Sequence, residues 1–427
     1  MSISALKELK TDMEKCFRCS LCKMVPLPAV KNPNFTDCCP ASRVYHFHAF
    51  SGSGKQIMAL SLIHGRIKAD NELAKAVFAC TTCGYCDVAC KFIMDAERHR
   101  INMRLREHLV EEGLSPKSHA EMMEKLRRMS NLQPTKNPWF DGLSVKKCAT
   151  DKTNILLLAG CMTEINDAFS RSARKFAQIL KKVGVDFFVD ETENCCGLPA
   201  YWLGYKEDFA TIAREKIAKF KNIGAKTVVV MSGSCYGALR SKYPEYAGEA
   251  GVNVLHATEL LWDLVKSGNL KFKKIVNFKV TYHDPCYLGR QSEPFVKQES
   301  KEKITFGCMT YTEPVKKINF GVNGVYDPPR KLLENIFGLD FREMYRIREY
   351  SFCCGGGGGV PATFPEMGRA SALHRIEEAL DVGADYLVTA CGHCEEHFRN
   401  AQGEDEKIKI VDIIDLIYEA LGLGEDK

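Results

Sequence analysis

Long apolar runs are missing from this chain of 427 residues. No stretch approaches the roughly 18 consecutive apolar residues that a membrane-spanning helix needs. The longest apolar runs, residues 155–159 and 228–231, have the length of strands. The first fifteen residues are polar and lack the apolar centre of a secretory signal. We therefore expect a cytoplasmic protein that does not insert into a membrane and that reaches one only through a partner.

Signatures of nucleic-acid and nucleotide binding are also missing. The formal net charge of +5 is not gathered into a basic stripe with interleaved aromatic residues, so no nucleic-acid partner is expected. Residues 51–56 contain glycine and lysine, but Ala49 and Gln56 stand where a phosphate-binding loop needs a glycine and a hydroxyl residue. The glycine run 355–359 follows a cysteine pair instead of a strand, which excludes a dinucleotide fingerprint. Any flavin would therefore come from a partner.

Cysteine, in contrast, is abundant, with 20 residues in the chain. A disulfide scaffold is typical of short secreted chains, and this chain is long and lacks a secretory signal. A structural zinc site needs two pairs of ligands that close a tetrahedron, and the cysteine spacings do not form such pairs. Cys148 and Cys308 have no partner by spacing and are expected to be free thiols. Most of the others predict iron–sulfur clusters, which suit an oxygen-poor cytoplasm.

Two cysteine runs lie in the first hundred residues. The second run consists of Cys80, Cys83, Cys86 and Cys90. Its spacing is that of bacterial ferredoxins, in which three cysteines hold one cubane and the fourth serves the neighbouring cluster. The earlier run begins in the same way, and its last ligand is Cys39 rather than the spare Cys38, because Pro40 follows it as in the ferredoxin run. We predict two [4Fe–4S] cubane clusters, one held by Cys16, Cys19, Cys22 and Cys90 and the other by Cys80, Cys83, Cys86 and Cys39.

Further along the chain, predicted strands and helices alternate, and the same order occurs twice. Such alternation predicts parallel sheets covered by helices. The cysteines lie at the C-terminal ends of the predicted strands, where open α/β sheets place their ligands. We therefore predict an α/β fold with two repeated parallel-sheet domains and a mainly helical ferredoxin-like domain. The expected ranges are 1–112 for the ferredoxin-like domain, 113–152 for a helix and linker, 153–272 for the first repeat and 273–427 for the second.

Each repeat carries a Cys-Cys-Gly motif. The first repeat supplies Cys161, Cys195, Cys196 and Cys235, and the second supplies Cys286, Cys353, Cys354, Cys391 and Cys394. Adjacent cysteines cannot easily form a disulfide with each other, but they can bind neighbouring irons of one cluster. Gly197 and Gly355 allow the backbone to approach inorganic sulfide closely. His283 and His393 stand beside the second set, where a hydrogen bond near a cluster and simple packing are both open.

The duplicated pattern Cys…Cys-Cys-Gly…Cys-x2-Cys, preceded by a two-cluster ferredoxin unit, resembles the heterodisulfide reductase D-type family. The stretch 282–290, Tyr-His-Asp-Pro-Cys-Tyr-Leu-Gly-Arg, and the segment 327–330 resemble that family too. Similar architectures include electron-transfer subunits of class II benzoyl-coenzyme A reductase-like complexes. The resemblance covers nearly the whole chain, and it implies a noncubane [4Fe–4S] cluster at the five cysteines of the second repeat.

The chain departs from the family pattern in two places. In the first repeat Ser232 stands where the fifth cysteine would be, which leaves open an ordinary cubane, an altered noncubane cluster or no cluster. We expect one further [4Fe–4S] cluster there. The inserted segment 291–325 separates two motifs that the family keeps close together. Its place near Cys286 suits a lid or a docking surface, and a tolerated surface loop is an equal alternative.

A row of clusters suits the transfer of single electrons. We expect an iron–sulfur electron-transfer subunit of a larger anaerobic oxidoreductase complex, with a flavoprotein or ferredoxin donor and a terminal reductase or dehydrogenase as partners. In one alternative, a disulfide is reduced at a catalytic set formed by Cys286, Cys353, Cys354, Cys391 and Cys394. In another, the clusters serve a non-enzymatic redox sensor or scaffold, which their number argues against. The incomplete first set favours the electron-transfer role.

Overall fold

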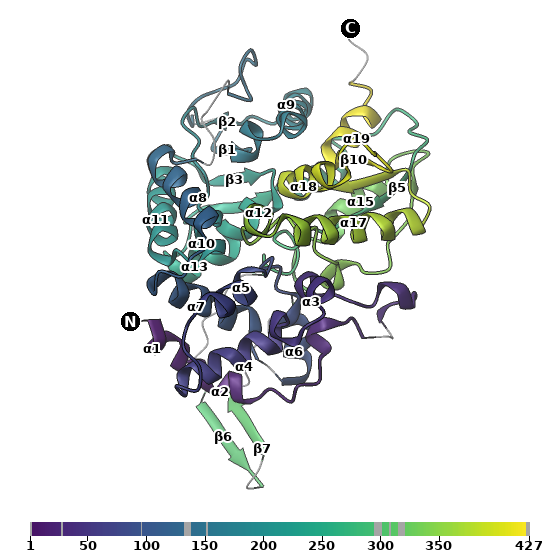
Figure 1. The fold of residues 1–427 in the computed structure, drawn as a ribbon. Helices are drawn as coiled ribbons and strands as arrows, with labels where there is room; N and C mark the ends of the chain where they lie inside the picture. The colour runs from purple at the N-terminus through teal and green to yellow at the C-terminus, as the bar shows by residue number, and fades with distance from the viewer. Residues whose placement is uncertain are drawn as a thin grey trace.

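The computed structural model describes residues 2–26, 29–94, 96–131, 138–150, 153–293, 301–306, 309–314 and 321–423. A helical region from the first part of the chain lies at the bottom of Figure 1, and two α/β domains stand side by side above it. The predicted fold class is therefore confirmed. Cys308 and parts of the expected linker 113–152 and insertion 291–325 lie outside the described residues.

The N-terminal region is built from short helices, some of which begin at a side-chain cap. Ser51 accepts a hydrogen bond from Gly54 N, and Asp70 accepts one from Leu73 N. The segment 51–56, which does not match a phosphate-binding loop, is thus the capped start of a helix. The helices are α1 (Ser2–Lys7), α2 (Lys10–Glu14), α3 (Pro40–Tyr45), α4 (Gly52–Ile63), α5 (Asn71–Phe78), α6 (Tyr85–Met94), α7 (Arg98–Glu111) and α8 (Lys117–Met129).

The first α/β domain contains a parallel sheet with the strand order β2-β1-β3-β4. Its strands are β1 (Ile155–Leu158), β2 (Phe188–Val189), β3 (Thr227–Val230) and β4 (Asn253–His256). Runs of leucine and valine form β1 and β3 because helices cover both faces of a parallel sheet and bury its strands. The helices are α9 (Asp167–Lys182), α10 (Leu198–Leu203), α11 (Lys206–Asn222), α12 (Gly233–Gly237), α13 (Tyr243–Tyr246) and α14 (Ala257–Lys266).

The second α/β domain repeats this topology with the strand order β10-β9-β5-β8. Its strands are β5 (Lys279–Tyr282), β8 (Asp340–Phe341), β9 (Tyr386–Thr389) and β10 (Lys409–Asp412). Its helices are α15 (Asp327–Glu334), α16 (Val360–Thr363), α17 (Pro365–Asp381), α18 (Gly392–Gln402) and α19 (Ile413–Ala420). The predicted internal repeat is thus visible as two sheets of the same strand order.

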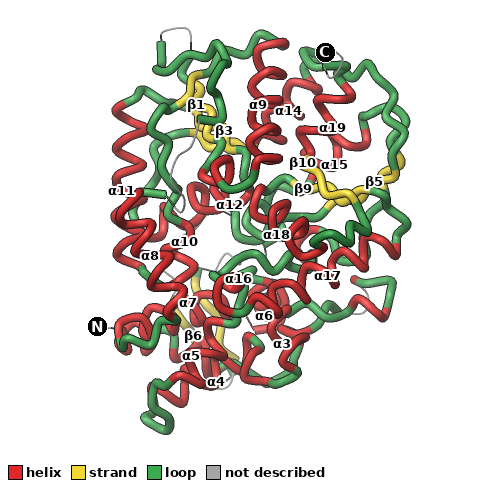
Figure 2. The backbone as a smooth tube through the Cα atoms, turned by 45° about the horizontal axis from the view of Figure 1, so that its top comes forward, coloured by secondary structure: helices red, strands yellow, loops and turns green. Residues whose placement is uncertain are grey.

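The two domains meet where their central strands end. Helices α12 and α18, which follow β3 and β9, lie next to each other between the two sheets (Figures 1 and 2). Gly233 N donates to Ala390 O across this junction at 3.2 Å. One continuous apolar core contains side chains from both sheets, among them Val229 and Val388. The carboxyl ends of the two sheets therefore come together instead of facing away from each other.

A buried arginine joins the helical region to both domains. Arg106 of α7 is fully buried. Its guanidinium donates to carbonyl oxygens of Phe78 and Cys80 in the helical region, Trp202 in the first domain and Gly358 in the second. Because a buried cation needs such partners, this residue fixes the three parts against one another.

The insertion forms a two-stranded hairpin that projects from the bottom of the molecule (Figure 1). Its antiparallel strands are β6 (Lys301–Thr305) and β7 (Met309–Glu313). Ile304 and Phe306 on this hairpin are exposed. At the base, the Glu293 carboxylate accepts hydrogen bonds from Gly321 N and Asn323 N, which closes the insertion where it leaves the domain. Within the described ranges, no helix is long and apolar enough to cross a membrane.

Candidate iron–sulfur sites

The first cavity lies between α3, α4 and α6. Its cysteines are Cys22, Cys39, Cys80, Cys83 and Cys86. The structure thus brings together the four cysteines predicted for one cubane, with Cys22 at the rim shared with its neighbour. Cys39 stands at the N-cap position of α3, and Pro40 takes the first helical position. Burial raises the pKa of the Cys39 thiol to about 12, while the nearby Lys55 charge opposes this rise.

The second cavity adjoins the first one. It is lined by Cys16, Cys19, Cys22 and Cys90, which are the four cysteines predicted for the other cubane. Arg98 Nε donates to Cys90 Sγ at 2.9 Å, and Cys22 Sγ donates to Ser53 Oγ at 3.3 Å. Cys19 is exposed, and its neighbour Phe17 is 79% exposed. This cavity is therefore the one that lies nearest to solvent.

The glycine at the start of helix α4 lies against the cysteines of these cavities. A Cβ atom on Gly52 would lie 2.7 Å from Cys86 Cβ and 3.5 Å from Cys22 Cβ. The glycine therefore leaves the space into which the two cysteines point. This packing explains the glycine at the start of the helix without a phosphate ligand.

Three cysteines without a predicted ligand role differ in their surroundings. Cys38 lines neither cavity; it is fully buried, and burial raises the pKa of its thiol well above the usual value. Cys148 is an exposed free thiol. Cys308 lies outside the described residues.

The five cysteines of the second repeat form one continuous row of thiol contacts. Cys286 contacts Cys353, Cys354 contacts both Cys353 and Cys394, and Cys394 contacts Cys391. Hydrogen bonds from its two thiol neighbours hold the pKa of Cys354 well below its usual value, and the contact between Cys354 and Cys394 raises the pKa of Cys394. All are buried except Cys286, which is half-buried.

The backbone after the cysteine pair turns toward the sulfurs. Gly355 N lies 3.4 Å from Cys353 Sγ, and Gly356 N lies 3.4 Å from Cys354 Sγ. A φ angle of +92° at Gly355 produces this turn, and an L-residue with a side chain rarely adopts that angle. The glycine that follows Cys353 and Cys354 is thus needed to aim amide groups at the site.

The four cysteines of the first repeat also meet, in a second and separate group. Cys161 Sγ lies 3.7 Å from Cys195 Sγ, and Cys196 contacts both Cys195 and Cys235. All four are buried. Close by, the Glu193 carboxylate accepts a hydrogen bond from Gly160 N, and burial raises the pKa of Glu193 to about 7.

Ser232, at the position of the missing fifth cysteine, contacts the other domain. Its Oγ lies 3.7 Å from Cys391 Sγ, and Ser234 Oγ lies 3.3 Å from the same sulfur. Ser232 stands at the N-cap position of α12 and Ser234 lies within α12, which packs against the start of α18. The first domain therefore contributes two hydroxyl groups to the second cysteine set.

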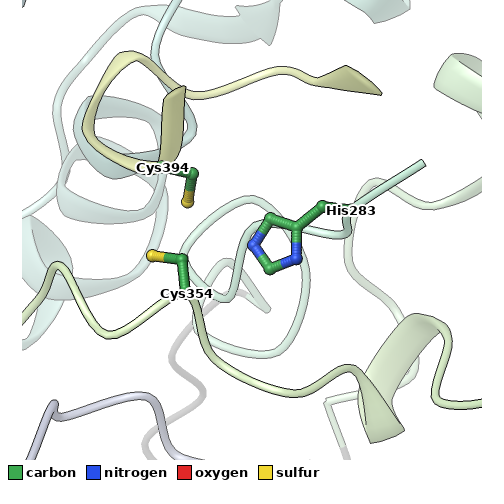
Figure 3. Close-up of side chains that lie close together, drawn as sticks. All are labelled: His283, Cys354 and Cys394. Carbon is green, nitrogen blue, oxygen red and sulfur yellow. The ribbon is translucent and has the colours of Figure 1, made fainter. Parts of the chain in front are cut away.

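Two histidines stand at the second set, as the sequence suggests. His283, Cys354 and Cys394 offer ligand atoms that all lie within 4.8 Å of one another, and the imidazole points between the two sulfurs (Figure 3). Burial and the neighbouring Arg375 charge lower the pKa of His283 to about 3. His393 contacts Cys391 and stacks edge-on against Trp202, with ring centroids 5.4 Å apart.

The ferredoxin-like region and the second repeat touch through two cysteines. The Cys83 and Cys353 thiols are in hydrogen-bonding contact, and this contact with burial raises the pKa of Cys83. Arg290 lies beside them and donates to Cys83 O at 3.1 Å and to Ser351 O at 2.6 Å. Sequence reasoning gave Arg290 no role of its own, although it ends the Tyr-His-Asp-Pro-Cys stretch and could have been singled out there as a buried cation.

The chemistry of these groups fits iron–sulfur clusters. Each group is made of sulfur donors, and soft thiolate ligands select such clusters. The two cavities of the helical region each contain the four cysteines predicted for one cubane, and Cys22 lines both cavities. The second repeat presents five thiols in one row, and the first repeat presents four. Nitrogen and oxygen groups stand around the sulfurs as hydrogen-bonding neighbours.

Comparisons with known proteins agree with this organisation. The 4Fe-4S dicluster domain family matches residues 12–93, and the cysteine-rich domain family matches residues 155–240 and 305–399. The D-type chain of the dihydromethanophenazine:CoB–CoM heterodisulfide reductase of Methanosarcina mazei is 30% identical over 431 residues, which cover 96% of this chain and 95% of the relative. The chain belongs to the heterodisulfide reductase D-type family. The family resemblance expected from the cysteine pattern is thus confirmed, and this family member is an iron–sulfur oxidoreductase subunit.

A second relative of this heterodisulfide reductase D-type protein is longer. The EtfAB:quinone oxidoreductase of Syntrophomonas wolfei is 27% identical over 376 residues, which cover 82% of this chain and 47% of the relative. This chain thus spans about half the length of that protein. Among solved structures, a hypothetical protein from Helicobacter pylori aligns with a TM-score of 0.50 at 12% identity, and the alignment covers 88% of this chain and 68% of the other. That likeness concerns the fold alone.

Proposed function

We propose that this chain relays single electrons as an iron–sulfur subunit of a larger anaerobic oxidoreductase complex. One [4Fe–4S] cubane would be held by Cys16, Cys19, Cys22 and Cys90, and the other by Cys80, Cys83, Cys86 and Cys39. A noncubane [4Fe–4S] cluster would be held by Cys286, Cys353, Cys354, Cys391 and Cys394. When bound, these clusters supply one-electron oxidation and reduction at potentials that their surroundings set.

The contact between Cys83 and Cys353 carries this proposal. Cys22 lines both cavities of the helical region, so the two ferredoxin sets share a wall. Cys83 then joins the inner ferredoxin set to the second repeat. The three sets thus follow one another from the exposed Cys19 to the buried Cys391, joined by the shared Cys22 at one junction and by the Cys83–Cys353 contact at the other.

Buried residues around the contact of Cys83 with Cys353 would set its charge environment and keep water away from it. Arg290 is buried and places a fixed positive charge beside Cys83 and Cys286. A buried cation favours the more negative state of neighbouring groups. Tyr287 OH lies 3.3 Å from Thr82 O, so the loop after Cys286 is fixed to the ferredoxin loop. Water is excluded because Tyr287 and Thr82 are themselves buried.

The first repeat has a different place in this proposal. We propose that Cys161, Cys195, Cys196 and Cys235 hold one further [4Fe–4S] cluster. The thiol contacts that carry the path link Cys83 to Cys353 and not to this group. The first group would therefore stand beside the electron path instead of within it.

A disulfide reductase is the second candidate function. The full set of five cysteines supports it, together with the partial exposure of Cys286, through which a disulfide substrate could reach the site. The Methanosarcina mazei relative is named as part of a heterodisulfide reductase. The burial of the other four cysteines favours the relay, because a substrate must touch the sulfurs or irons that it reduces.

The same preparation tests both functions. The chain is purified without oxygen, its iron is counted, and it is mixed with reduced viologen and either a heterodisulfide or an electron-accepting partner protein. The relay predicts reduction of the partner and no release of thiol. Release of thiol by the isolated chain at a steady rate would contradict the relay function and support the disulfide reductase function. Co-purification with a flavoprotein or with a terminal reductase or dehydrogenase would identify the partners.

A further inference from the structure

His283 is a buried histidine whose two ring nitrogens face different partners. Its Nδ1 lies 3.3 Å from Arg375 Nε. Its Nε2 finds no hydrogen-bond partner among the described residues, and the ring faces the sulfurs of Cys354 and Cys394 (Figure 3). Phe398 packs edge-on against the ring with centroids 4.9 Å apart. The imidazole is therefore held in one orientation with one nitrogen unsatisfied.

Arg375 decides which nitrogen carries the proton. A guanidinium stays protonated and acts only as a donor. Arg375 Nε therefore donates to Nδ1, which must offer its lone pair, and the proton of the neutral imidazole lies on Nε2. Arg375 itself is fixed, because Nη1 donates to Glu378 Oε2 at 2.6 Å and Nη2 donates to Ser351 Oγ at 3.2 Å.

A bond from His283 to iron would require the opposite arrangement. Nε2 would need its lone pair for the metal, and the proton on Nδ1 would then point at the N–H group of Arg375. Two donors would face each other in a buried place, which is costly. Metal-bound histidines commonly donate their other N–H to a carboxylate, a carbonyl or water, and His283 has an arginine there.

We propose that His283 donates its Nε2 proton as a hydrogen bond to the cluster sulfurs at Cys354 and Cys394 and is not an iron ligand. This inference rests on the proposed function, because it takes a cluster at the five-cysteine set. A donor beside cluster sulfur stabilises the reduced, more negative form and raises the reduction potential. In the first repeat Leu158 stands three residues before Cys161, where His283 stands before Cys286, so this position supplies no donor to the first set.

Two substitutions test the hydrogen bond. His283→Leu copies the first repeat and removes the donor, whereas His283→Gln keeps an N–H group near the position of Nε2. In an anaerobic redox titration followed by electron paramagnetic resonance, we expect His283→Leu to keep its iron. The ratio of reduced to oxidised cluster at a fixed potential should fall about tenfold, which equals a shift of about 59 mV for one electron. His283→Gln should recover part of this shift.

His108 offers a matched control. It is a buried histidine on α7 whose Nδ1 lies 4.0 Å from Glu112 Oε1. The substitution His108→Leu removes the same group from the core of the helical region. It should leave the potential of the second-repeat cluster unchanged, so a shift common to both leucine variants would count against a local hydrogen bond and overturn the inference.

The unsubstituted protein supplies a measurement that does not depend on a variant's folding. Electron nuclear double resonance of the reduced protein, before and after transfer to deuterated water, should show an exchangeable proton coupled to the cluster. Labelling of histidine with nitrogen-15 should show only the weak coupling of a hydrogen-bonded nitrogen. The strong coupling of a coordinated imidazole, or an unchanged potential in His283→Leu, would overturn the inference.

Failure of the underlying cluster assignment is recognised separately. Cys353→Ser removes a proposed ligand and should abolish the signal that the His283 variants shift. If Cys353→Ser and the unsubstituted protein have the same iron content and the same spectrum, the cluster is not at this set. That result would overturn the proposed function and this inference with it, whereas a lost Cys353→Ser signal with an unshifted His283→Leu potential would overturn only the hydrogen bond.

Discussion

The two Cys-Cys-Gly domains share a sheet topology and differ in what surrounds their cysteines. Helices α11 and α17 are each followed by a glycine, Gly224 in the first domain and Gly383 in the second. Relative to these glycines, Lys216 occupies the same position as Arg375. Lys219 likewise occupies the same position as Glu378. In the second domain, Arg375 and Arg346 both bind Glu378, and all three side chains are fully buried. In the first domain, the corresponding lysines donate to separate groups.

The repeated fold therefore preserves four of the five cysteine positions, with Ser232 at the fifth, and does not preserve their environment. In the second domain Arg375 reaches His283 and through it the cysteine set. In the first domain Lys216 Nζ donates to Asn194 O beside Cys195 at 2.5 Å, and a leucine takes the histidine position. A connected network of buried charges therefore leads to the second set, whereas near the first set Lys216 and Glu193 make separate hydrogen bonds to the backbone.

The largest expected effect comes from matched cysteine substitutions. Cys353→Ser should remove one cluster and stop the passage of electrons from the ferredoxin-like region to a partner, because Cys353 is both a proposed ligand and the contact of Cys83. Cys195→Ser, at the corresponding place in the first domain, should reduce iron content but leave most of the electron transfer. Iron analysis and anaerobic stopped-flow reduction measure both. Equal losses of electron transfer would show that the two sites stand in one path.

The buried ion network should separate the domains in stability. Glu378→Gln leaves the buried charges of Arg346 and Arg375 without their shared carboxylate and should lower the free energy of unfolding by about 3–5 kcal/mol. Lys219→Gln in the first domain breaks a pair with Asp190 that is closer to solvent and should cost about 0–1 kcal/mol. Anaerobic urea denaturation followed by circular dichroism compares them. Similar losses in the free energy of unfolding would mean that the Lys219–Asp190 pair stabilises the protein as much as the Glu378 network does.

The serines that the first domain places at the second site should have a smaller effect. Ser234→Ala removes a hydroxyl 3.3 Å from Cys391 Sγ and should disfavour the reduced cluster by about 1 kcal/mol, because hydrogen bonds to the sulfurs favour the more negative form. Ser232→Ala, at 3.7 Å, should shift the potential less. The redox titration described for His283 measures both shifts. A change in the first cluster alone would contradict the contact across the domain junction.

The smallest effect is expected from the insertion, which the first domain does not have. Replacement of residues 294–320 by a short glycine linker removes the projecting hairpin and keeps Glu293, whose carboxylate binds Gly321 N and Asn323 N. The free energy of unfolding should change by no more than about 0.5 kcal/mol, with iron content unchanged. Loss of electron transfer to a partner with intact clusters would instead identify the hairpin as a docking surface.

The sequence predicted the elements that depend on local pattern. Apolar runs such as 228–231 predicted the central strands, and the ferredoxin pattern predicted four of the thiols that line each cavity of the helical region, although not the place of Cys22 in both. Contacts that depend on the packing of one domain against another could not be predicted in this way. The approach of Cys83 to Cys353 and of Ser234 to Cys391 joins residues more than 150 positions apart, and no periodicity connects them.

The role of a single side chain was also beyond the sequence when a distant partner sets it. His283 was recognised as a neighbour of the cysteine set, but the choice between hydrogen bonding and packing needed the position of Arg375 on another element. Ser232 was recognised as the substitute for a fifth cysteine. Its contact with the other domain follows from the placement of α12 against α18, which the repeat by itself does not specify.

Arg106 has a consequence for how such proteins can be recombined. Its guanidinium is held by carbonyl groups from the ferredoxin-like region and from both α/β domains. A chimera that exchanges only one of these parts with a relative must reproduce the carbonyl positions contributed by the others, or it leaves a cation without acceptors in the interior. We therefore expect a chimera to fold most readily when all three parts are exchanged together.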